Sequence, residues 1–257
     1  MRLFGLIGYP LSHSFSKKYF TEKFEKEGLL ECRYELFPIE FIEQLPDILH
    51  ENPELEGLNV TIPYKKKVLT YLDKKENIPA ELGACNCISI KDGKLIGYNT
   101  DFNGFKKTIS PLLKPHHKKA LVLGNGGATA AVTYALIQLG LEYAVVSRKI
   151  HPGSTFTYAD IDENIIGAHS IIINTTPLGM YPKTDNCPAI PYKFITGQHL
   201  LYDLLYNPAK TLFLQKGEER GATIKNGEEM LIQQAKESWN IWNSELSPPA
   251  QAGSGSL

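Results

Sequence analysis

The chain has 257 residues, of which 42% are hydrophobic and 21% are charged, and its formal net charge is −1. This length allows one large domain or two smaller ones, and the balanced charge argues against a nucleic-acid-binding surface. No apolar run approaches the roughly 18 residues of a membrane-spanning helix, and the first residues lack the pattern of a signal peptide. We therefore expect a cytoplasmic protein without nucleic-acid or membrane partners.

In the first hundred residues, short apolar runs alternate with amphipathic segments. Phe15 and Tyr19, and Phe20 and Phe24, are each four residues apart, which places aromatic side chains on one helical face that Gly28 can cap. This spacing predicts the first helix of the chain. The predicted strands are residues 3–8, 33–39 and 57–63, and the predicted helices are 15–28 and 41–49, the latter interrupted by Pro46.

Two local signals follow along the chain. Thr61 and Pro63 suit the start of a helix after the third strand. Asp92 and Gly93 supply the two positive-φ positions of a type I′ turn, which predicts a hairpin over residues 87–98. Another helix begins with Thr100 or Asp101 as its N-cap.

The second part of the chain shows a more regular alternation. The predicted strands are residues 118–124, 143–148, 170–176 and 199–206, and the predicted helices are 128–140, ended by Gly140, and 228–246. Continuous apolar strands between helices are typical of a parallel sheet covered on both faces. Residues 247–257 have no periodicity and are predicted to be a disordered tail.

The four cysteines, Cys32, Cys85, Cys87 and Cys187, do not predict a metal centre. Paired zinc ligands are usually separated by two to four residues, whereas only one residue separates Cys85 from Cys87. We expect reduced, buried thiols and no metal site.

A glycine-rich turn, GNGGA at residues 124–128, lies between a predicted strand and a predicted helix. This context is that of a dinucleotide-binding loop, in which glycines let the backbone approach a pyrophosphate. Thr129 stands where the general pattern has Gly or Ala, and glycines also serve as plain turns. The next strand ends in Ser147, Arg148 and Lys149 with no acid, which favours the 2′-phosphate of NADP over the ribose of NAD. The alternative is that these are solvated charges at a strand end.

Several fragments together resemble the shikimate dehydrogenase family, in the family's order and across the chain to about residue 245. They are PLSHSFS (10–16), NVTIPYK (59–65), Asn86, NTDFNG (99–104), GNGGA (124–128), NTTPLGM (174–180), YNP (206–208) and MLIQQA (230–235). The resemblance implies an N-terminal α/β substrate domain, made of residues 1–103 and 226–246, and a Rossmann-like parallel-sheet NADP domain over 104–225. The active site then lies in the cleft between them.

The resemblance also implies which residues form the site. Lys65 and Asp101 match the catalytic pair. The implied substrate-binding residues are Ser14, Ser16, Asn59, Thr61, Asn86, Tyr206 and Gln234. The implied cofactor-binding residues are Gly124, Asn125, Gly126, Gly127, Ala128, Ser147, Arg148, Lys149, Asn174, Thr175, Met180 and Gly227.

The sequence departs from the common family pattern at three places. Asn125 replaces an alanine of the glycine loop, Ser147-Arg148-Lys149 replaces Asn-Arg-Thr, and Lys17 stands where a proline is common. The first two concern cofactor affinity, and none of the three alters the groups implied to react.

Simple structural roles compete with the catalytic ones for the same side chains. Lys65 begins a lysine triplet, which is usually a solvated helix face, and Asp101 alone would most often be a helix N-cap. One of Ser14 and Ser16 can likewise cap a helix. In the catalytic interpretation, Lys65 meets Asp101 in the cleft and stabilises the oxygen on which charge develops.

The resemblance implies NADPH-dependent reduction of 3-dehydroshikimate to shikimate by a monomer or homodimer. One alternative is a quinate/shikimate dehydrogenase with relaxed substrate or cofactor use. Another is a non-catalytic NADP-binding sensor, which would not need to retain Lys65 and Asp101.

Overall fold

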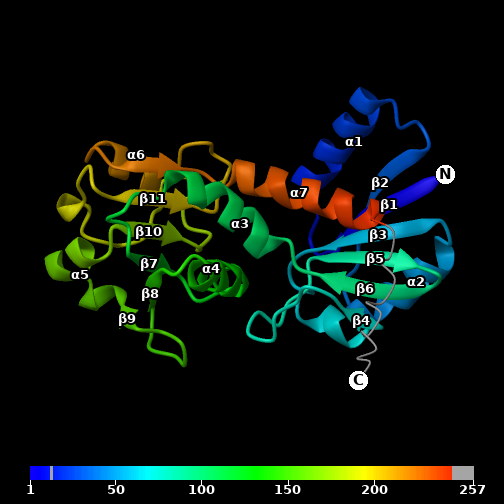
Figure 1. Ribbon diagram of the computed structural model, residues 1–257, viewed down its shortest axis with the longest axis horizontal. Coiled ribbons are helices and arrows are strands. Elements are labelled where there is room, and N and C mark those ends of the chain that lie inside the picture. The colour runs from blue at the N-terminus through cyan, green and yellow to red at the C-terminus, as the bar shows by residue number, and fades with distance from the viewer. Residues whose placement is uncertain (12–13, 245–257) are drawn as a thin grey trace, which may run out of the picture.

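Two α/β units lie side by side in the computed structural model, which describes residues 1–11 and 14–244 (Figure 1). The predicted tail at 247–257 lies outside these residues. Within the described ranges, every helix is too short or too polar to cross a membrane.

The first unit is built on a six-stranded mixed sheet with the order β2-β1-β3-β5-β6-β4. Strands β2, β1 and β3 are parallel, β5 runs antiparallel to β3, and β5 and β6 form an antiparallel hairpin. Asp92 (φ 50°) and Gly93 (φ 71°) make the hairpin turn, as predicted. The strands are β1 (Arg2–Gly8), β2 (Cys32–Pro38), β3 (Leu55–Val60), β4 (Lys74–Lys75), β5 (Cys87–Lys91) and β6 (Lys94–Tyr98).

Both faces of this sheet are covered by side chains from short helices. Helix α2 (Leu45–Glu51) packs on the face that contains Leu3 and Ile7, and α1 (Phe15–Glu27) packs on the face that contains Phe4 and Leu6. The predicted aromatic face of α1 is confirmed for Phe20 and Phe24, which are buried against this second face with Tyr19 packed beside them, whereas Phe15 lines the cavity described below.

The second unit is a parallel six-stranded sheet with the order β12-β11-β10-β7-β8-β9. Alternate residues of β7 enter two separate cores, which confirms a parallel sheet covered on both faces. The strands are β7 (Lys119–Leu123), β8 (Glu142–Ser147), β9 (Phe156–Thr157), β10 (Ile171–Asn174), β11 (Leu200–Asp203) and β12 (Thr223–Lys225). The helices beside them are α4 (Gly127–Gln138), α5 (Glu163–Ala168) and α6 (Leu212–Glu218).

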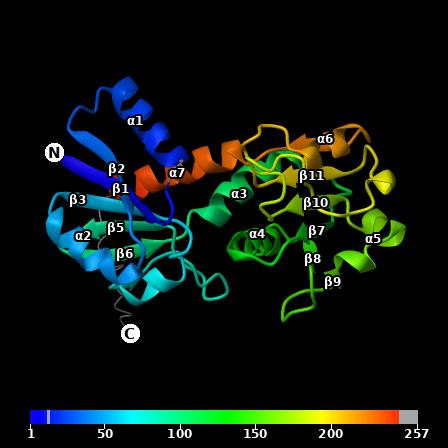
Figure 2. The same cartoon turned by 180° about the vertical axis from the view of Figure 1, so that it is seen from behind.

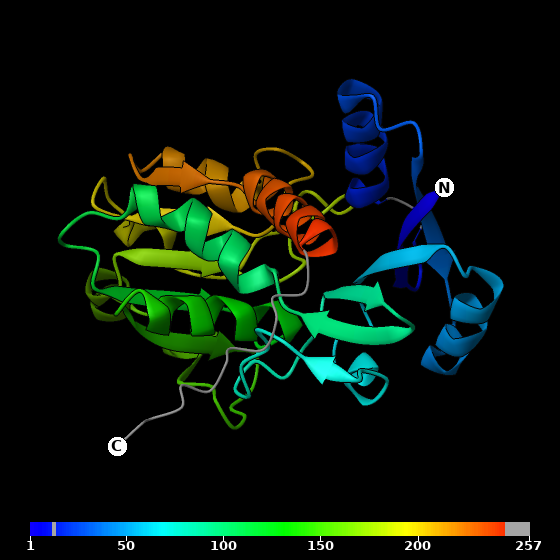
Figure 3. The same ribbon diagram turned by 45° about the vertical axis from the view of Figure 1, so that its right-hand side comes forward.

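Two helices run between the units, α3 (Asp101–Ile109) and α7 (Glu228–Asn243), as Figures 1 and 2 show from opposite sides. Met230, near the start of α7, belongs to the core of the parallel sheet together with Phe105. Trp242, near its end, belongs to the core of the first sheet and donates a hydrogen bond to the Ile88 carbonyl (2.9 Å). The 45° view of Figure 3 shows α3 and α7 side by side, and an ion pair between Lys107 and Glu237 (2.6 Å) joins them.

The helix predicted to begin at Thr61 is wrong. Residues 61–66 form turns, and a 3-10 helix, η2 (Lys67–Thr70), follows them. The reason is that the backbone carbonyl of Lys65 accepts from the N–H of Cys85 (2.7 Å) and is therefore not available to a helical ladder. Pro46 also does not interrupt α2. It lies in the first turn, where no N–H is needed, after the 3-10 turn η1 (Ile42–Gln44).

A histidine before β7 is held in its neutral form by its surroundings. The N–H of Lys114 donates to Nδ1 of His117 (3.0 Å), so the proton is on Nε2, which faces the Gln198 carbonyl (3.3 Å). Burial lowers the pKa of His117, with smaller contributions from the nearby charges of His116, Lys114 and His199, while the hydrogen bond to Gln198 opposes the shift.

This geometry predicts that stability falls on acidification. The pKa of His117 is lower in the folded chain than its ordinary value of 6.5, so its contribution is full above that pH and is lost as the pH falls below it. Urea unfolding at about pH 7.5 and about pH 5.5 should show a smaller pH dependence in His117→Asn than in the parent. The exposed His50→Asn should keep the parent's dependence. Equal dependence in all three proteins would contradict the prediction.

Candidate active site

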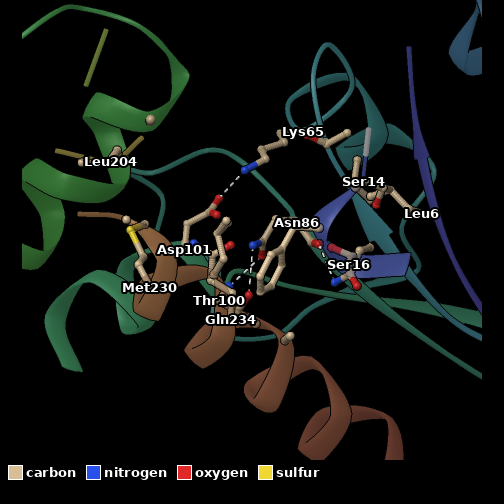
Figure 4. A pocket seen from close by; sticks show the side chains of 18 of the residues that line it. Leu6, Ser14, Ser16, Lys65, Asn86, Thr100, Asp101, Leu204, Met230 and Gln234 are labelled. Atoms are coloured by element: carbon tan, nitrogen blue, oxygen red, sulfur yellow. Dashed lines mark hydrogen bonds and ion pairs between the residues drawn. The ribbon is translucent and has the colours of Figure 1, made fainter. Parts of the chain in front are cut away.

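A cavity of about 380 Å³ lies between the two units. Its walls come from the turn after β3, the start of α3, the first turns of α7 and the loop after β11. Figure 4 shows Lys65 and Asp101 pointing toward each other on one side, with Ser14 and Ser16 across from them. All the predicted substrate-binding and catalytic residues line it: Ser14, Ser16, Asn59, Thr61, Lys65, Asn86, Asp101, Tyr206 and Gln234.

The central feature of the cavity is a direct ion pair. Nζ of Lys65 lies 2.7 Å from Oδ2 of Asp101, and their side chains are 30% and 12% exposed. The two residues are 36 positions apart in the chain, so the fold brings them together. Lys66 and Lys67 are exposed, whereas Lys65 is drawn into the cleft. The solvated-triplet interpretation therefore describes its neighbours but not Lys65.

Asp101 is free to pair with Lys65 because another residue caps α3. Oδ1 of Asn99 accepts from the backbone N–H groups of Asp101 (3.0 Å) and Phe102 (3.4 Å). Its amide nitrogen donates to the Ala84 carbonyl (2.8 Å), which fixes the cap. Thr100 occupies the N-cap position, as predicted, but its side chain makes no capping bond, and Asn99 supplies that bond instead. The preference of asparagine for N-cap positions was the signal available in the sequence.

Two predicted substrate-binding asparagines already have protein partners. Both ends of the Asn86 amide pair with Thr100, one with its backbone N–H (2.7 Å) and the other with its hydroxyl (3.0 Å). Asn59 accepts from the Tyr34 hydroxyl (2.9 Å) and donates to the Ser238 hydroxyl (2.9 Å). These bonds orient both side chains at the cavity wall. Asn86 retains capacity for one further bond at each end of its amide, whereas Asn59 also donates to the Asn86 carbonyl (3.3 Å) and retains capacity at its oxygen only.

The hydroxyls at the other wall are less committed. Ser14 caps α1 by accepting from the N–H of Lys17 (3.2 Å) and also lines the cavity, so one side chain is placed for both roles. Lys17, where the family often has proline, pairs with Glu35 (2.8 Å). Tyr206 reaches the cavity from the parallel-sheet unit and contacts Phe15 of α1, with ring centroids 5.8 Å apart.

A second cavity, of about 450 Å³, opens at the glycine turn. Gly124 has φ of 113°, which favours glycine, and an added Cβ at Gly126 or Gly127 would meet open space. The turn thus presents bare backbone at the start of α4, where free N–H groups favour an anion. The residues lining this cavity are Gly124, Asn125, Gly126, Ser147, Arg148, His151, Tyr158, Thr175, Thr176, Pro177 and Leu178.

Thr129, the departure from the general glycine pattern, ties the turn together. Its hydroxyl accepts from the Gly126 N–H (3.1 Å) and lies within hydrogen-bond distance of the Gly124 carbonyl (3.1 Å) and the Thr175 hydroxyl (2.9 Å). Gly or Ala at this position could make none of these bonds. The substitution therefore preserves the turn by a different interaction.

The remaining predicted cofactor residues lie at varied positions around the glycine turn. The buried Ser147 hydroxyl pairs with Ser154 (2.8 Å), while Arg148 and Lys149 are exposed, and of these two only Arg148 lines the second cavity. Asn174 is fully buried and donates to Asp203 (3.0 Å). The other placements are Gly127 beside the turn, Ala128 and Gly227 in the cleft cavity, and Met180 exposed on the loop after β10.

The cysteines are free throughout the described residues. Burial raises the pKa of Cys85 to about 12 and also raises that of Cys87, so both are protonated thiols rather than metal-binding thiolates. Among residues 1–11 and 14–244, no group of three or more His, Cys, Asp or Glu side chains is arranged to hold a metal ion.

A family model and two similar relatives found by comparison with known proteins all name shikimate dehydrogenase. Residues 6–88 match the family model of the shikimate dehydrogenase substrate binding domain. Shikimate dehydrogenase (NADP(+)) of Clostridium beijerinckii is 40% identical, over 94% of this chain and 92% of the relative. The Carboxydothermus hydrogenoformans enzyme of the same name is 35% identical, over 97% and 94%.

A solved structure is similar to this chain across both units. The shikimate 5-dehydrogenase of Thermus thermophilus, in complex with NADP(H) and shikimate, superposes with a TM-score of 0.83. It is 29% identical, over 97% of this chain and 96% of that chain.

The start of α7 provides a steric test of the cleft. A Cβ on Gly227 would lie 2.0 Å from the Leu204 carbonyl oxygen, so either the loop after β11 or α7 would have to move. We predict that Gly227→Ala lowers the free energy of unfolding by about 1–3 kcal/mol, the usual cost of overpacking. Denaturant unfolding measures this change.

Gly167→Ala is the matched control for that experiment. Gly167 lies within α5, and an added Cβ there meets open space. This variant should be more stable than the parent by about 0.5–1 kcal/mol. A Gly227→Ala protein as stable as Gly167→Ala would show that the close approach at Leu204 does not constrain the cleft.

Proposed function

The chain belongs to the shikimate dehydrogenase family, and on that premise we propose that it catalyses the reversible NADPH-dependent reduction of 3-dehydroshikimate to shikimate. It is an NADP-dependent oxidoreductase of aromatic amino-acid biosynthesis. The substrate domain comprises residues 1–103 and 226–246, and the NADP domain comprises residues 104–225.

The observation that carries the proposal is the contact between Lys65 and Asp101 at 2.7 Å, inside a cavity that the glycine-turn unit also lines. A non-catalytic NADP-binding sensor has no use for a partly buried ammonium paired in this way. An exposed ion pair contributes little to stability, and a partly desolvated one costs free energy to form. The arrangement is therefore better explained by chemistry in the cleft.

The side chains around the glycine turn fit NADP. Gly126 and Gly127 offer an open backbone cradle for the diphosphate. Arg148 lines the same cavity as Gly126, where its guanidinium suits a 2′-phosphate. When bound, NADP(H) supplies or accepts the hydride, and the protein supplies position and field.

Lys65 handles the proton in this mechanism. As an ammonium it stabilises the negative charge that develops on the ring oxygen and donates a proton to it. Asp101 orients the amine through their 2.7 Å contact. In the reverse direction, neutral Lys65 accepts the proton of the hydroxyl. Residues from both units line the cleft around this pair, whose side chains are 30% and 12% exposed.

Recognition of the ring depends on the other cavity side chains. Ser14 and Ser16 bind the carboxylate, and Asn59, Thr61, Asn86, Tyr206 and Gln234 read the hydroxyls. A pocket that bonds each hydroxyl discriminates against analogues that lack one, because its own polar groups are then left unpaired. We assign shikimate over quinate as substrate in line with the named relatives, and NADP over NAD as cofactor because Arg148 lines the glycine-turn cavity.

We further propose a cytoplasmic enzyme that acts as a monomer or homodimer. The four free cysteines support a reducing compartment, since disulfides are rare there. Light scattering of the purified protein distinguishes one chain mass from two.

A spectrophotometric assay that follows reduced cofactor tests the function directly. The parent should turn over shikimate with NADP faster than quinate with NADP or shikimate with NAD. If the protein turns over shikimate with neither NADP nor NAD, the proposal is rejected.

Removing either member of the ion pair should impair the chemical step. We predict that Lys65→Ala and Asp101→Asn each lower kcat at least about 100-fold, the lower end of the range for general acid–base catalysis. The exposed neighbour gives the control, and Lys67→Ala should keep parental kcat. If Lys65→Ala and Asp101→Asn both retain near-parental kcat, neither residue takes part in the reaction.

Loss of the guanidinium should weaken NADP selectively. We predict that Arg148→Ala raises KM for NADP at least about 10-fold, because a charge-assisted hydrogen bond to phosphate is lost, and leaves KM for NAD nearly unchanged. Arg220→Ala, at an exposed arginine after α6, should alter neither constant. A parallel rise of both KM values in Arg148→Ala would argue against contact with the 2′-phosphate.

A further inference from the structure

A single buried carboxylate joins two loops at the carboxyl edge of the parallel sheet. Asp203 ends β11 and is fully buried. Its Oδ1 accepts from the Asn174 side chain (3.0 Å) and from the Leu205 N–H (3.1 Å), and its Oδ2 accepts from the Thr211 hydroxyl (2.5 Å).

The first of the two loops follows β10. The Asn174 amide that donates to Asp203 also accepts from the N–H (3.0 Å) and the hydroxyl (2.6 Å) of Thr176. The Thr176 hydroxyl in turn accepts from the Leu178 N–H (3.2 Å). This chain of bonds shapes the part of the loop that lines the glycine-turn cavity.

The second loop follows β11 and faces the other cavity. Leu204 and Tyr206 line the cleft beside Lys65. The loop returns at Thr211, which caps α6 and donates to Asp203, so both ends of the loop are fixed on one carboxylate. A backbone hydrogen bond from Tyr181 to the Asn207 carbonyl (3.3 Å) connects this loop to the first one.

The carboxylate is costly to keep at this position. Burial raises the pKa of Asp203 to about 6, and within residues 1–11 and 14–244 no Lys, Arg or His forms an ion pair with it. Three donors converge on its two oxygens. The carboxylate accepts from all three, whereas an amide would have to donate to the Thr211 hydroxyl in place of accepting from it.

We propose that Asp203 is a positioning residue for hydride transfer. It fixes the position of the loop that lines the cofactor cavity relative to the loop that carries Tyr206 into the cleft. This inference rests on the proposed function. It assigns the alignment of the two bound molecules to a residue that touches neither of them. An alignment error of about 1 Å can cost a large factor in rate.

The chain offers a matched pair of variants that test the proposal. Thr211→Val removes one donor to Asp203 with little change of shape. Thr108→Val removes the buried Thr108 hydroxyl, which forms a 2.7 Å hydrogen bond with the hydroxyl of Tyr202. Tyr202 is the residue before Asp203 in β11. Both delete one buried threonine hydroxyl beside the same strand, but only the first touches the loops. Asp203→Asn is the second test variant.

Three quantities should be measured for each full-length protein: kcat for shikimate oxidation, the NADP dissociation constant by calorimetry and the melting temperature. We expect Thr211→Val and Asp203→Asn to lower kcat at least about fivefold and to raise the NADP dissociation constant at least about threefold relative to Thr108→Val. Thr108→Val should stay near the parent in both, although its melting temperature falls comparably.

The opposite result is equally clear. If Thr211→Val matches Thr108→Val in kcat and in NADP affinity, Asp203 serves stability alone and the proposal is overturned, even where Asp203→Asn fails to fold. A parent protein that binds NADP but does not oxidise shikimate counts against the proposed function, and the NADP dissociation constants then decide on Asp203. A parent that does not bind NADP overturns both.

Discussion

Helix α7 packs in the cores of both sheets, and the cleft depends on this packing. Met230 lies in the core of the parallel sheet, and Trp242 lies in the core of the mixed sheet. A helix is stiff over this length, so the distance between the two sheets is set by side-chain packing at its ends. Gln234 lies between them, at the cavity. The cavity therefore lies along the span of α7 from Met230 in one core to Ala235 in the other.

The chemistry of the cleft depends on structural roles being carried by neighbours of the reacting groups. Asn99 caps α3, so Asp101 does not have to, and Thr100 holds Asn86 from both sides. Thr129 does the same for the glycine turn. Asn99 and Thr129 satisfy local backbone groups with their side chains, so the residues beside them do not have to, whereas Asn86 itself accepts from the backbone N–H of Thr100.

Most of the long elements could be predicted from the sequence, because their hydrophobic periodicity was clear and turn or glycine residues marked their ends. Gly28 and Gly140 end their helices at φ of 67° and 68°, and Asp92-Gly93 turns the hairpin. The short pieces β4, β9, α5 and α6 carry too few residues for a periodic signal and were not predicted. The turn at 61–66 failed for another reason, since a long-range bond from Cys85 to the Lys65 carbonyl overrides local helix signals. At the site, motifs identified which side chains meet, whereas Asn99, Ser238 and Asp203 emerged only from hydrogen bonds across the fold.

Helix α7, which packs in the cores of both units, also limits how parts of this protein could be exchanged with those of other proteins. The stretch that forms the parallel sheet lies between two parts of the chain that build the other unit, which makes it resemble a replaceable cassette. Yet Phe105 on α3 and Met230 on α7 both fill its core. A foreign nucleotide-binding unit inserted here would inherit those two side chains as part of its own interior. A working chimera must therefore fit the surfaces of α3 and α7 as well as the two chain junctions. The segment that has to be exchanged is larger than the parallel sheet alone.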